Sequence, residues 1–268
     1  MRLDQAVAAR FPHLSRRQAR ELIAERRVLV NERSVSIASR EVHDGDRIAV
    51  IDEVPKLEIL KLTDGFVAVN KPAGMPTQPT RDRKQRSIEE FLRAQFKSIY
   101  LVHRIDTGAS GVVVFARTRD AAASLSGLFS SRAIRKTYLL RVEGIIDHVM
   151  TIESPIGGKD AFTMVRPYGV IPSEARDPLR KRDGDPSPSS RLRMTTLIEA
   201  EIQTGRTHQI RIHLASIGHP VAGDRRYGGA KAPRLMLHAW KLDHETIGSI
   251  EAPPPDDLIR STAEWKPK

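Results

Sequence analysis

The chain has 268 residues, a formal net charge of +11 at pH 7 and no cysteine, which excludes disulfides, thiolate nucleophiles and cysteine-zinc sites. Because no run approaches about 18 apolar residues and the first residues lack the apolar stretch of a signal peptide, we expect a cytoplasmic protein without a membrane segment. The positive charge favours a partner that carries phosphate groups, although a basic protein without such a partner is the alternative.

Residues 1–52 are the first predicted module, an α/β unit of two helices and short strands. Leu3 and Val7 begin a short helical pattern, and Ser15 is a typical N-cap for a second helix, RRQARELIAER. VLVNERSVSI predicts two strands around a turn at residues 31–33, and HDGDRIAV predicts a turn and a third strand. Residues 1–40 carry nine arginines against four acidic residues. Three of these arginines, Arg16, Arg17 and Arg20, share the polar side of the second helix, which favours contact with phosphates.

This stretch resembles the S4-type RNA-binding domain in RLDQAVAARFP, in SRRQARELIAERRVLVNER and in the closing DGDRIAV. The resemblance implies that the arginine-bearing helix lies on RNA. Residues 53–60, which include VPKLEIL, are predicted to be a linker to the next domain.

The second predicted domain covers residues 61–250. FVAVN predicts a strand that runs into a Lys-Pro-Gly turn, SIEEFLRAQF a helix capped by Ser87, and DAAASLSGLFSSRAI a further helix. RKTYLLRVEGII and residues 152–165 predict sheet. Residues 166–194 are rich in proline, aspartate and arginine and predict an exposed insertion loop. A strand, a turn at Thr204–Gly205, a helix over residues 207–216, a glycine-rich loop and a final strand, LMLHAWKLDH, follow. Residues 251–268 predict a polar tail.

Asp106 is the first candidate for chemistry. It lies in HRIDTGASG, directly before the apolar strand VVVF. An aspartate before Thr-Gly is common in turns, because its carboxylate accepts hydrogen bonds from nearby amides. The neighbouring His103 and Arg104 and the buried strand that follows favour a reactive carboxylate at the edge of a core.

A second polar cluster, QTGRTHQIRIH, could converge on Asp106. It supplies five side chains within eight residues: Arg206, His208, Gln209, Arg211 and His213. A basic helix that contacts phosphates is one interpretation, and an arginine that pairs with Asp106 is another. Metal binding by His208 and His213 lacks an accompanying set of carboxylates.

Tyr138 alternates with apolar residues in RKTYLLRV. A half-buried core tyrosine fits this pattern. A ring that stacks on an RNA base also fits, because basic residues flank it and such stacking contributes about 1 to 3 kcal/mol.

Four ordered motifs between residues 60 and 245 resemble the RluA-type pseudouridine synthases: NKPAG, HRIDTGASG, RKTY and GRTHQIRIHLASIGHPVAGDRRYG. The resemblance implies an α+β fold with a two-lobed catalytic domain on a mixed, mostly antiparallel sheet, beside the small S4-like module. It implies that Asp106 is the catalytic aspartate and Arg211 its basic partner. Tyr138 is then the active-site tyrosine that stacks on the target base and takes part in removing the C5 proton. Arg104 is then expected to hold the displaced RNA or to fill the gap left by a flipped nucleotide, and His103 to be structural.

These expectations define an isomerase that converts uridine to pseudouridine in structured RNA. Asp106 would act as nucleophile at C1′ or as base at C2′, and the sequence leaves both open. Nothing is oxidised, so we expect neither a redox cofactor nor a metal. The expected RNA contacts are Arg16, Arg17, Arg20, Arg104, Arg206, His208 and Gln209. Large-subunit (23S) rRNA is the favoured substrate, tRNA remains possible, and a monomer is expected.

Two other functions stay open at this point. A non-catalytic RNA-binding or ribosome-assembly factor would use the same basic surface and would not need Asp106. A metal-dependent RNA hydrolase would use His208 and His213, and it would lose activity in EDTA.

Overall fold

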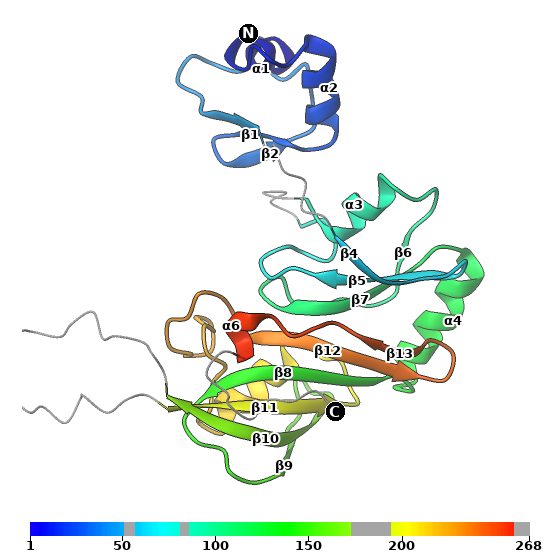
Figure 1. The fold of residues 1–268 in the computed structure, drawn as a ribbon, viewed down its shortest axis with the longest axis vertical. Helices are drawn as coiled ribbons and strands as arrows, with labels where there is room; N and C mark the ends of the chain where they lie inside the picture. Colours follow the sequence, from blue (N-terminus) through cyan, green and yellow to red (C-terminus); the bar gives the residue numbers. More distant parts are fainter. Residues whose placement is uncertain (51–56, 81–85, 173–193, 260–268) are drawn as a thin grey trace, which may run out of the picture. The chain divides into compact units, whose positions relative to one another are not determined.

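The structure is a computed structural model that describes residues 1–50, 57–80, 86–172 and 194–259. The chain divides into two compact units (Figure 1). One unit combines residues 1–57 and 75–97, and the other combines residues 58–74 and 98–268. Each unit is described by itself below.

The N-terminal part of the first unit packs two helices on a three-stranded sheet. The helices are α1 (Leu3–Arg10) and α2 (Arg16–Ala24), and the strands β1 (Val28–Val30), β2 (Arg33–Val35) and β3 (Ile48–Val50) lie in the order β2-β1-β3, all antiparallel. Both helices and all three strands were predicted from the sequence. Their apolar side chains form one aliphatic core, which includes Leu3, Val7, Ile23 and Val28.

Local sequence signals account for these elements. The Ser15 hydroxyl accepts a hydrogen bond from the Gln18 amide while the Gln18 side chain returns to Ser15, a complete capping box. Asn31 and Glu32 both have positive φ, 51° and 66°, as the two-residue turn between β1 and β2 requires. The second helix therefore begins at Arg16, as predicted, but it ends at Ala24, two residues before the end of the predicted segment. The hairpin turn is confirmed, although Arg33, predicted in the turn, begins β2.

The first helix buries one charge, Asp4, whose side chain has no exposed surface. Burial alone would raise the pKa of this carboxyl, but hydrogen bonds from Arg20, Arg16 and Arg2 outweigh it and lower the pKa from 3.8 to about 2. Asp4 therefore stays ionised inside the module at neutral pH.

This shift predicts an acid-labile module. A carboxyl with a depressed folded-state pKa stabilises the fold above its unfolded pKa, and this stabilisation is lost as pH falls through the folded pKa. We expect the stability of residues 1–50 to fall between about pH 4 and pH 2, measured by amide hydrogen exchange at Leu3 and Val7 in the full chain. The same loss in Asp4→Asn would contradict the assignment.

The first unit also contains α3 (Ile88–Arg93), which was predicted from the sequence. Ser87 and Glu90 form a second capping box, and Glu89 adds negative charge to the first turn. The helix buries Ile88 and Leu92 completely.

The second unit is built on a ten-stranded sheet within the described residues (Figure 1). Its main path runs β4-β5-β7-β12-β8-β11-β10-β9, with β13 beside β12 and β6 beside β7. All strand pairs are antiparallel except β7 with β12. The predicted mixed, mostly antiparallel sheet is confirmed. The strands are β4 (Glu58–Leu62), β5 (Phe66–Lys71), β6 (Tyr100–Leu101), β7 (Ser110–Ala116), β8 (Arg135–Glu143), β9 (Met150–Glu153), β10 (Phe162–Pro172), β11 (Met194–Ile202), β12 (Leu237–His244) and β13 (Gly248–Glu251).

The catalytic candidates depend on β7, which is buried along its whole length. Helix α4 (Arg119–Ser130) packs against its core through Leu125. Helix α5 (Gln209–Ser216) follows β11, and the short helix α6 (Asp256–Ile259) follows β13.

Gly111 allows β7 and β12 to approach each other. Its φ is +113°, and a Cβ atom built there would lie 2.1 Å from the carbonyl oxygen of Ala239. We expect Gly111→Ala to destabilise the chain by about 3 kcal/mol, because it adds both backbone strain and a collision with a backbone atom. Thermal unfolding measures this loss. Gly127→Ala, in α4 with nothing within 4 Å, is the matched control and should leave stability unchanged or slightly higher.

The structure contains elements that the sequence did not predict. β4 begins at Glu58, inside the predicted linker 53–60, whose residues 53–56 lie outside the described residues. Its charged residues and a register shift between Ile59 and Lys61 hide the strand pattern. β6 and β13 were also missed, and α6 lies within the predicted polar tail.

The predicted insertion loop 166–194 is shorter than expected. β10 continues to Pro172 and pairs antiparallel with β11, which begins at Met194. Pro167 and Gly169 suggested a loop, but they flank a register shift, where a strand tolerates both residues. The central residues 173–193 lie outside the described residues.

Candidate active site

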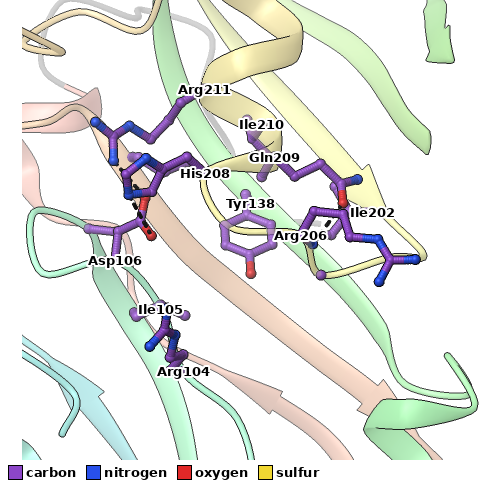
Figure 2. A pocket seen from close by; sticks show the side chains of 13 residues that line it. Arg104, Ile105, Asp106, Tyr138, Ile202, Arg206, His208, Gln209, Ile210 and Arg211 are labelled. Carbon is purple, nitrogen blue, oxygen red and sulfur yellow. Dashed lines mark hydrogen bonds and ion pairs between the residues drawn. The ribbon is translucent and has the colours of Figure 1, made fainter. Parts of the chain in front are cut away.

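A pocket in the second unit brings the predicted motifs together (Figure 2). It lies where the loop before β7, strand β8, the loop after β11 and the start of α5 meet. Its cavity measures about 80 Å³. The lining combines charged side chains with apolar ones: Arg104, Ile105, Asp106, Ala109, Tyr138, Ile202, Gly205, Arg206, His208, Gln209, Ile210, Arg211 and Leu237.

Asp106 lies in a tight turn, as its neighbours predicted, yet its carboxylate faces the other polar groups of the pocket (Figure 2). Its backbone carbonyl accepts a hydrogen bond from the Ala109 amide, 3.1 Å. The side chain is 24% exposed, so an incoming substrate can reach it. The turn is therefore held by a hydrogen bond to the backbone of Asp106, and its carboxylate is left to face the pocket.

Arg211 binds two carboxylates at once. Its Nη1 donates to Asp106 Oδ2 at 2.9 Å, while Nε and Nη2 donate to Asp224 Oδ2 at 2.6 Å and Oδ1 at 2.8 Å. Burial works against the charge of Arg211, but its hydrogen bonds to Asp224 and Asp106 raise its pKa above the ordinary value. Asp224 thus holds the guanidinium in the plane from which it can reach Asp106.

His208 approaches the other carboxylate oxygen. It precedes α5 in a left-handed conformation, φ 56°, and its Nε2 lies 3.8 Å from Asp106 Oδ1. Its Nδ1 lies 3.0 Å from the Tyr227 hydroxyl. Burial lowers the pKa of His208, with Asp106 acting in the opposite direction, so the imidazole is neutral at pH 7. Tyr227 therefore orients a neutral ring beside Asp106.

Tyr138 lies on β8, half-buried, with its ring between the Asp106 side and Arg206 (Figure 2). Burial, followed by the nearby charge of Asp106, raises the pKa of its phenol. The hydroxyl therefore keeps its proton at neutral pH, and Tyr138 offers an aromatic face and a hydroxyl to the pocket.

Lys71 was missed as a site residue, although its motif NKPAG was recognised. Its side chain is fully buried, and its ammonium donates to the carbonyl oxygens of Pro72 at 3.0 Å and Thr107 at 3.1 Å. Burial lowers its pKa to about 7, while the charge of Asp106 favours the protonated form. Lys71 thus links β5 to the turn that carries Asp106. In the sequence, the only signal for this role was the position of Lys71 next to Pro72 in the NKPAG motif.

Comparisons with known proteins agree with this arrangement. A family model described as RNA pseudouridylate synthase matches residues 65–216, and an S4 domain model matches residues 1–48. The chain belongs to the RluA-type RNA pseudouridine synthases. The sequence prediction of an RNA-modifying isomerase with an S4 domain is confirmed.

Two curated relatives cover most of this synthase. Ribosomal large subunit pseudouridine synthase D of Nitrosomonas europaea is 30% identical over 96% of this chain and 82% of its own length. The uncharacterized RNA pseudouridine synthase YhcT of Bacillus subtilis is 31% identical over 88% of this chain and 84% of its own. Among solved structures, human RNA Pseudouridylate Synthase Domain Containing 1 aligns with a TM-score of 0.59 and 25% identity, over 80% of this chain and 89% of that one.

The rim of the synthase pocket carries the two predicted RNA-binding arginines. Arg104 is exposed and makes no hydrogen bond or ion pair to the described part of the chain. Arg206 donates through Nε to the Asp160 carbonyl, 3.2 Å, and is half-buried. Both arginines line the pocket, and their contact with RNA stays a prediction.

Gln209 does not fit the predicted RNA contact. Its side chain is 3% exposed, and its amide nitrogen donates to Phe162 O and Thr163 Oγ1. Its amide oxygen accepts from Thr204 Oγ1 and the Arg206 amide. All four bonding positions are occupied, so Gln209 positions the start of α5.

Two further histidines of the motifs, His213 and His103, make structural contacts. His213 is fully buried, and both ring nitrogens are occupied, Nδ1 by Thr163 Oγ1 and Nε2 by the Ser154 carbonyl, each at 2.9 Å. His103 accepts from the Val114 amide and stacks on Phe129, as expected for a structural residue. His213 therefore has no free nitrogen for a metal, and the described residues contain no cluster of three metal-ligating side chains.

The three arginines of α2 differ in their contacts. Arg16 and Arg20 bond to Asp4. Within the described residues Arg17 pairs only with Glu21, and its side chain is 89% exposed.

The described helices include none long and apolar enough to cross a membrane.

Proposed function

We propose that Asp106 is the catalytic residue of the isomerisation. Arg211 and His208 orient its carboxylate, and Tyr138 stacks on the target base. The contact that supports this most directly is the pairing of Arg211 with Asp106 Oδ2. Oδ1 makes no hydrogen bond within the described residues and meets only His208 at 3.8 Å. Oδ1 is thus the oxygen with lone pairs available for attack at C1′ or for taking the C2′ proton.

The isomerisation exchanges one bond of the target uridine for another. The N1–C1′ bond breaks, the uracil turns, C5 joins C1′, and the C5 proton is lost while N1 gains a proton. A target uridine must leave its stack to reach Asp106, and the Tyr138 ring offers a stacking face in the pocket. Arg104 and Arg206 then hold the displaced strand through its phosphates.

We infer that the substrate is large-subunit rRNA. The inference is supported by the relatives named ribosomal large subunit pseudouridine synthase D, at 30% identity in Nitrosomonas europaea and 28% in Haemophilus influenzae, and by the S4 domain. A tRNA substrate is the competing possibility.

Pseudouridine mapping tests the substrate. Unmodified 23S rRNA and bulk tRNA are incubated with the protein or with Asp106→Ala, in EDTA. We expect new pseudouridine only in the 23S rRNA and only with the unsubstituted protein. Modification of tRNA alone would contradict the rRNA assignment, and modification by both proteins would contradict the role of Asp106.

A further inference from the structure

His208 has one ring nitrogen bonded inside the protein and one that faces the reacting carboxylate (Figure 2). Nδ1 lies 3.0 Å from the Tyr227 hydroxyl, whereas Nε2 lies 3.8 Å from Asp106 Oδ1, too far for a hydrogen bond. Within the described residues Nε2 makes no hydrogen bond. The side chain lines the pocket and is 19% exposed, so Nε2 is available to a molecule that enters.

The Asp106 carboxylate decides which nitrogen carries the proton of the neutral ring. A proton on Nδ1 would leave the lone pair of Nε2 facing the carboxylate, which is repulsive. A proton on Nε2 turns an N–H bond towards the same carboxylate, and Nδ1 then accepts the hydrogen bond that the Tyr227 hydroxyl can donate. The second arrangement is the more stable one, because the N–H dipole and the anion attract each other.

Tyr227 is itself held in place. Its backbone amide donates to Asp224 Oδ1 at 3.3 Å, its ring meets the His208 ring edge-on with centroids 5.7 Å apart, and the guanidinium of Arg211 lies 5.1 Å from its ring centroid. The loop that carries Tyr227 is tightly packed, since a Cβ atom built at Gly229 would lie 2.0 Å from a backbone oxygen. The hydroxyl therefore reaches His208 from a fixed position.

The reaction places the ribose of the target uridine next to Nε2. Under the proposed function Asp106 Oδ1 acts at C1′ or at C2′, and the 2′-oxygen is bonded to C2′, the neighbour of C1′. With Oδ1 at either carbon, a donor 3.8 Å from Oδ1 lies beside the 2′-oxygen in a cavity of about 80 Å³. The 2′-hydroxyl accepts hydrogen bonds, and it is the group that distinguishes RNA from DNA.

We propose that His208 binds the 2′-oxygen of the target uridine through its Nε2–H, and that Tyr227 is the positioning residue that fixes this tautomer. The proposal rests on the proposed function, because it takes Asp106 Oδ1 as the reacting oxygen. It adds a contact for the ribose to the stacking face that Tyr138 offers the base. The site thereby favours a ribonucleotide over a deoxyribonucleotide.

The tautomer is measured in the free protein at pH 7. Two-bond proton–nitrogen NMR correlations of histidine-labelled protein show which nitrogen is protonated, and His208→Asn assigns the signals. We expect the proton on Nε2 of His208, and a mixture of both tautomers in Tyr227→Phe. Tyr168→Phe is the matched control, because that hydroxyl donates to Glu199 at 3.1 Å outside the pocket. A proton on Nδ1 in the unsubstituted protein would overturn the proposal, and an unchanged tautomer in Tyr227→Phe would overturn the role of Tyr227.

Two substitutions of His208 separate the donor from the backbone. Asparagine suits the φ of 56° at this position better than glutamine does, because it is common in the left-handed region. Glutamine, however, brings an amide N–H near the position of Nε2, whereas asparagine reaches only to Nδ1. We expect His208→Asn to lower the single-turnover rate about 10-fold and His208→Gln about threefold, with RNA affinity within about twofold of the original. The reverse order of rates would contradict the donor role.

RNA without the acceptor tests the contact to the ribose. 23S rRNA and a pool of tRNA transcripts are each prepared with uridine or with 2′-deoxyuridine. We expect His208→Asn to slow modification about 10-fold on the uridine RNA but less than about twofold on the deoxyuridine RNA. An equal loss on both would overturn the contact, because the donor would then act on another atom. If the unsubstituted protein modified neither uridine RNA, the proposed function and the ribose contact would both be wrong, while the tautomer measured by NMR would stand.

Discussion

Asp106→Asn is expected to reduce isomerisation by about 10³-fold or more while RNA binding stays within about threefold of the original. The amide keeps the size of the side chain and can still accept the hydrogen bond from Arg211 Nη1. It lacks the anionic oxygen that attacks C1′ or takes the C2′ proton, and removal of such a group costs most of the rate. Single-turnover pseudouridine formation on 23S rRNA, with binding measured separately, checks both parts.

The control for Asp106→Asn is a carboxylate outside the pocket. Asp257 pairs with Arg234 through two 2.7 Å hydrogen bonds and is not among the pocket-lining residues. Asp257→Asn should retain the rate of isomerisation. Full activity of Asp106→Asn would show that the carboxylate is only part of the turn.

Asp224→Asn is expected to cause the second large effect, on stability and activity together. Asp224 is 1% exposed and binds Arg211 through both oxygens. Among the residues that the structure describes, its loss leaves the buried guanidinium with only Asp106 as a charged partner. Removal of one partner from a buried pair costs about 3 kcal/mol. Thermal unfolding should show this loss. The rate should fall while RNA affinity changes little, because Arg211 then no longer holds Asp106 in one orientation.

Asp257→Asn again serves as the comparison for Asp224→Asn. Its pair is also bidentate, but Asp257 is 40% exposed, so water replaces much of the lost interaction. A stability loss as large as that of Asp224→Asn would contradict the role of burial. An unchanged rate in Asp224→Asn would show that Asp224 supports the fold and does not position Arg211.

Local signals explain what the sequence predicted correctly. The capping boxes at Ser15 and Ser87 and the apolar run of β7 are each encoded within a few residues, so the corresponding elements appear where expected. β4 and the end of β10 were missed because their pairing with distant strands overrides charged, proline or glycine residues in the local pattern.

The candidate site also divides into contacts that the motifs predict and contacts that depend on the fold. The Asp106–Arg211 contact was proposed from motifs that lie 105 residues apart, and the geometry agrees. Asp224 and Tyr227 were inside a quoted motif but received no role, because their contacts depend on how the loop before β12 folds back on α5. Gln209 was misread because sequence alone does not show that its amide is fully bonded.

The position of β12 has a consequence for the growing chain. Residues 237–244 lie between β7 and β8 and supply the parallel partner of the strand that follows Asp106. A nascent polypeptide that has emerged only as far as β11 already contains Asp106, Tyr138 and Arg211, yet its sheet lacks a central strand. Pairing between segments so far apart forms late and slowly. The S4 module can therefore fold during translation, whereas catalytic competence must wait until nearly the whole chain has left the ribosome.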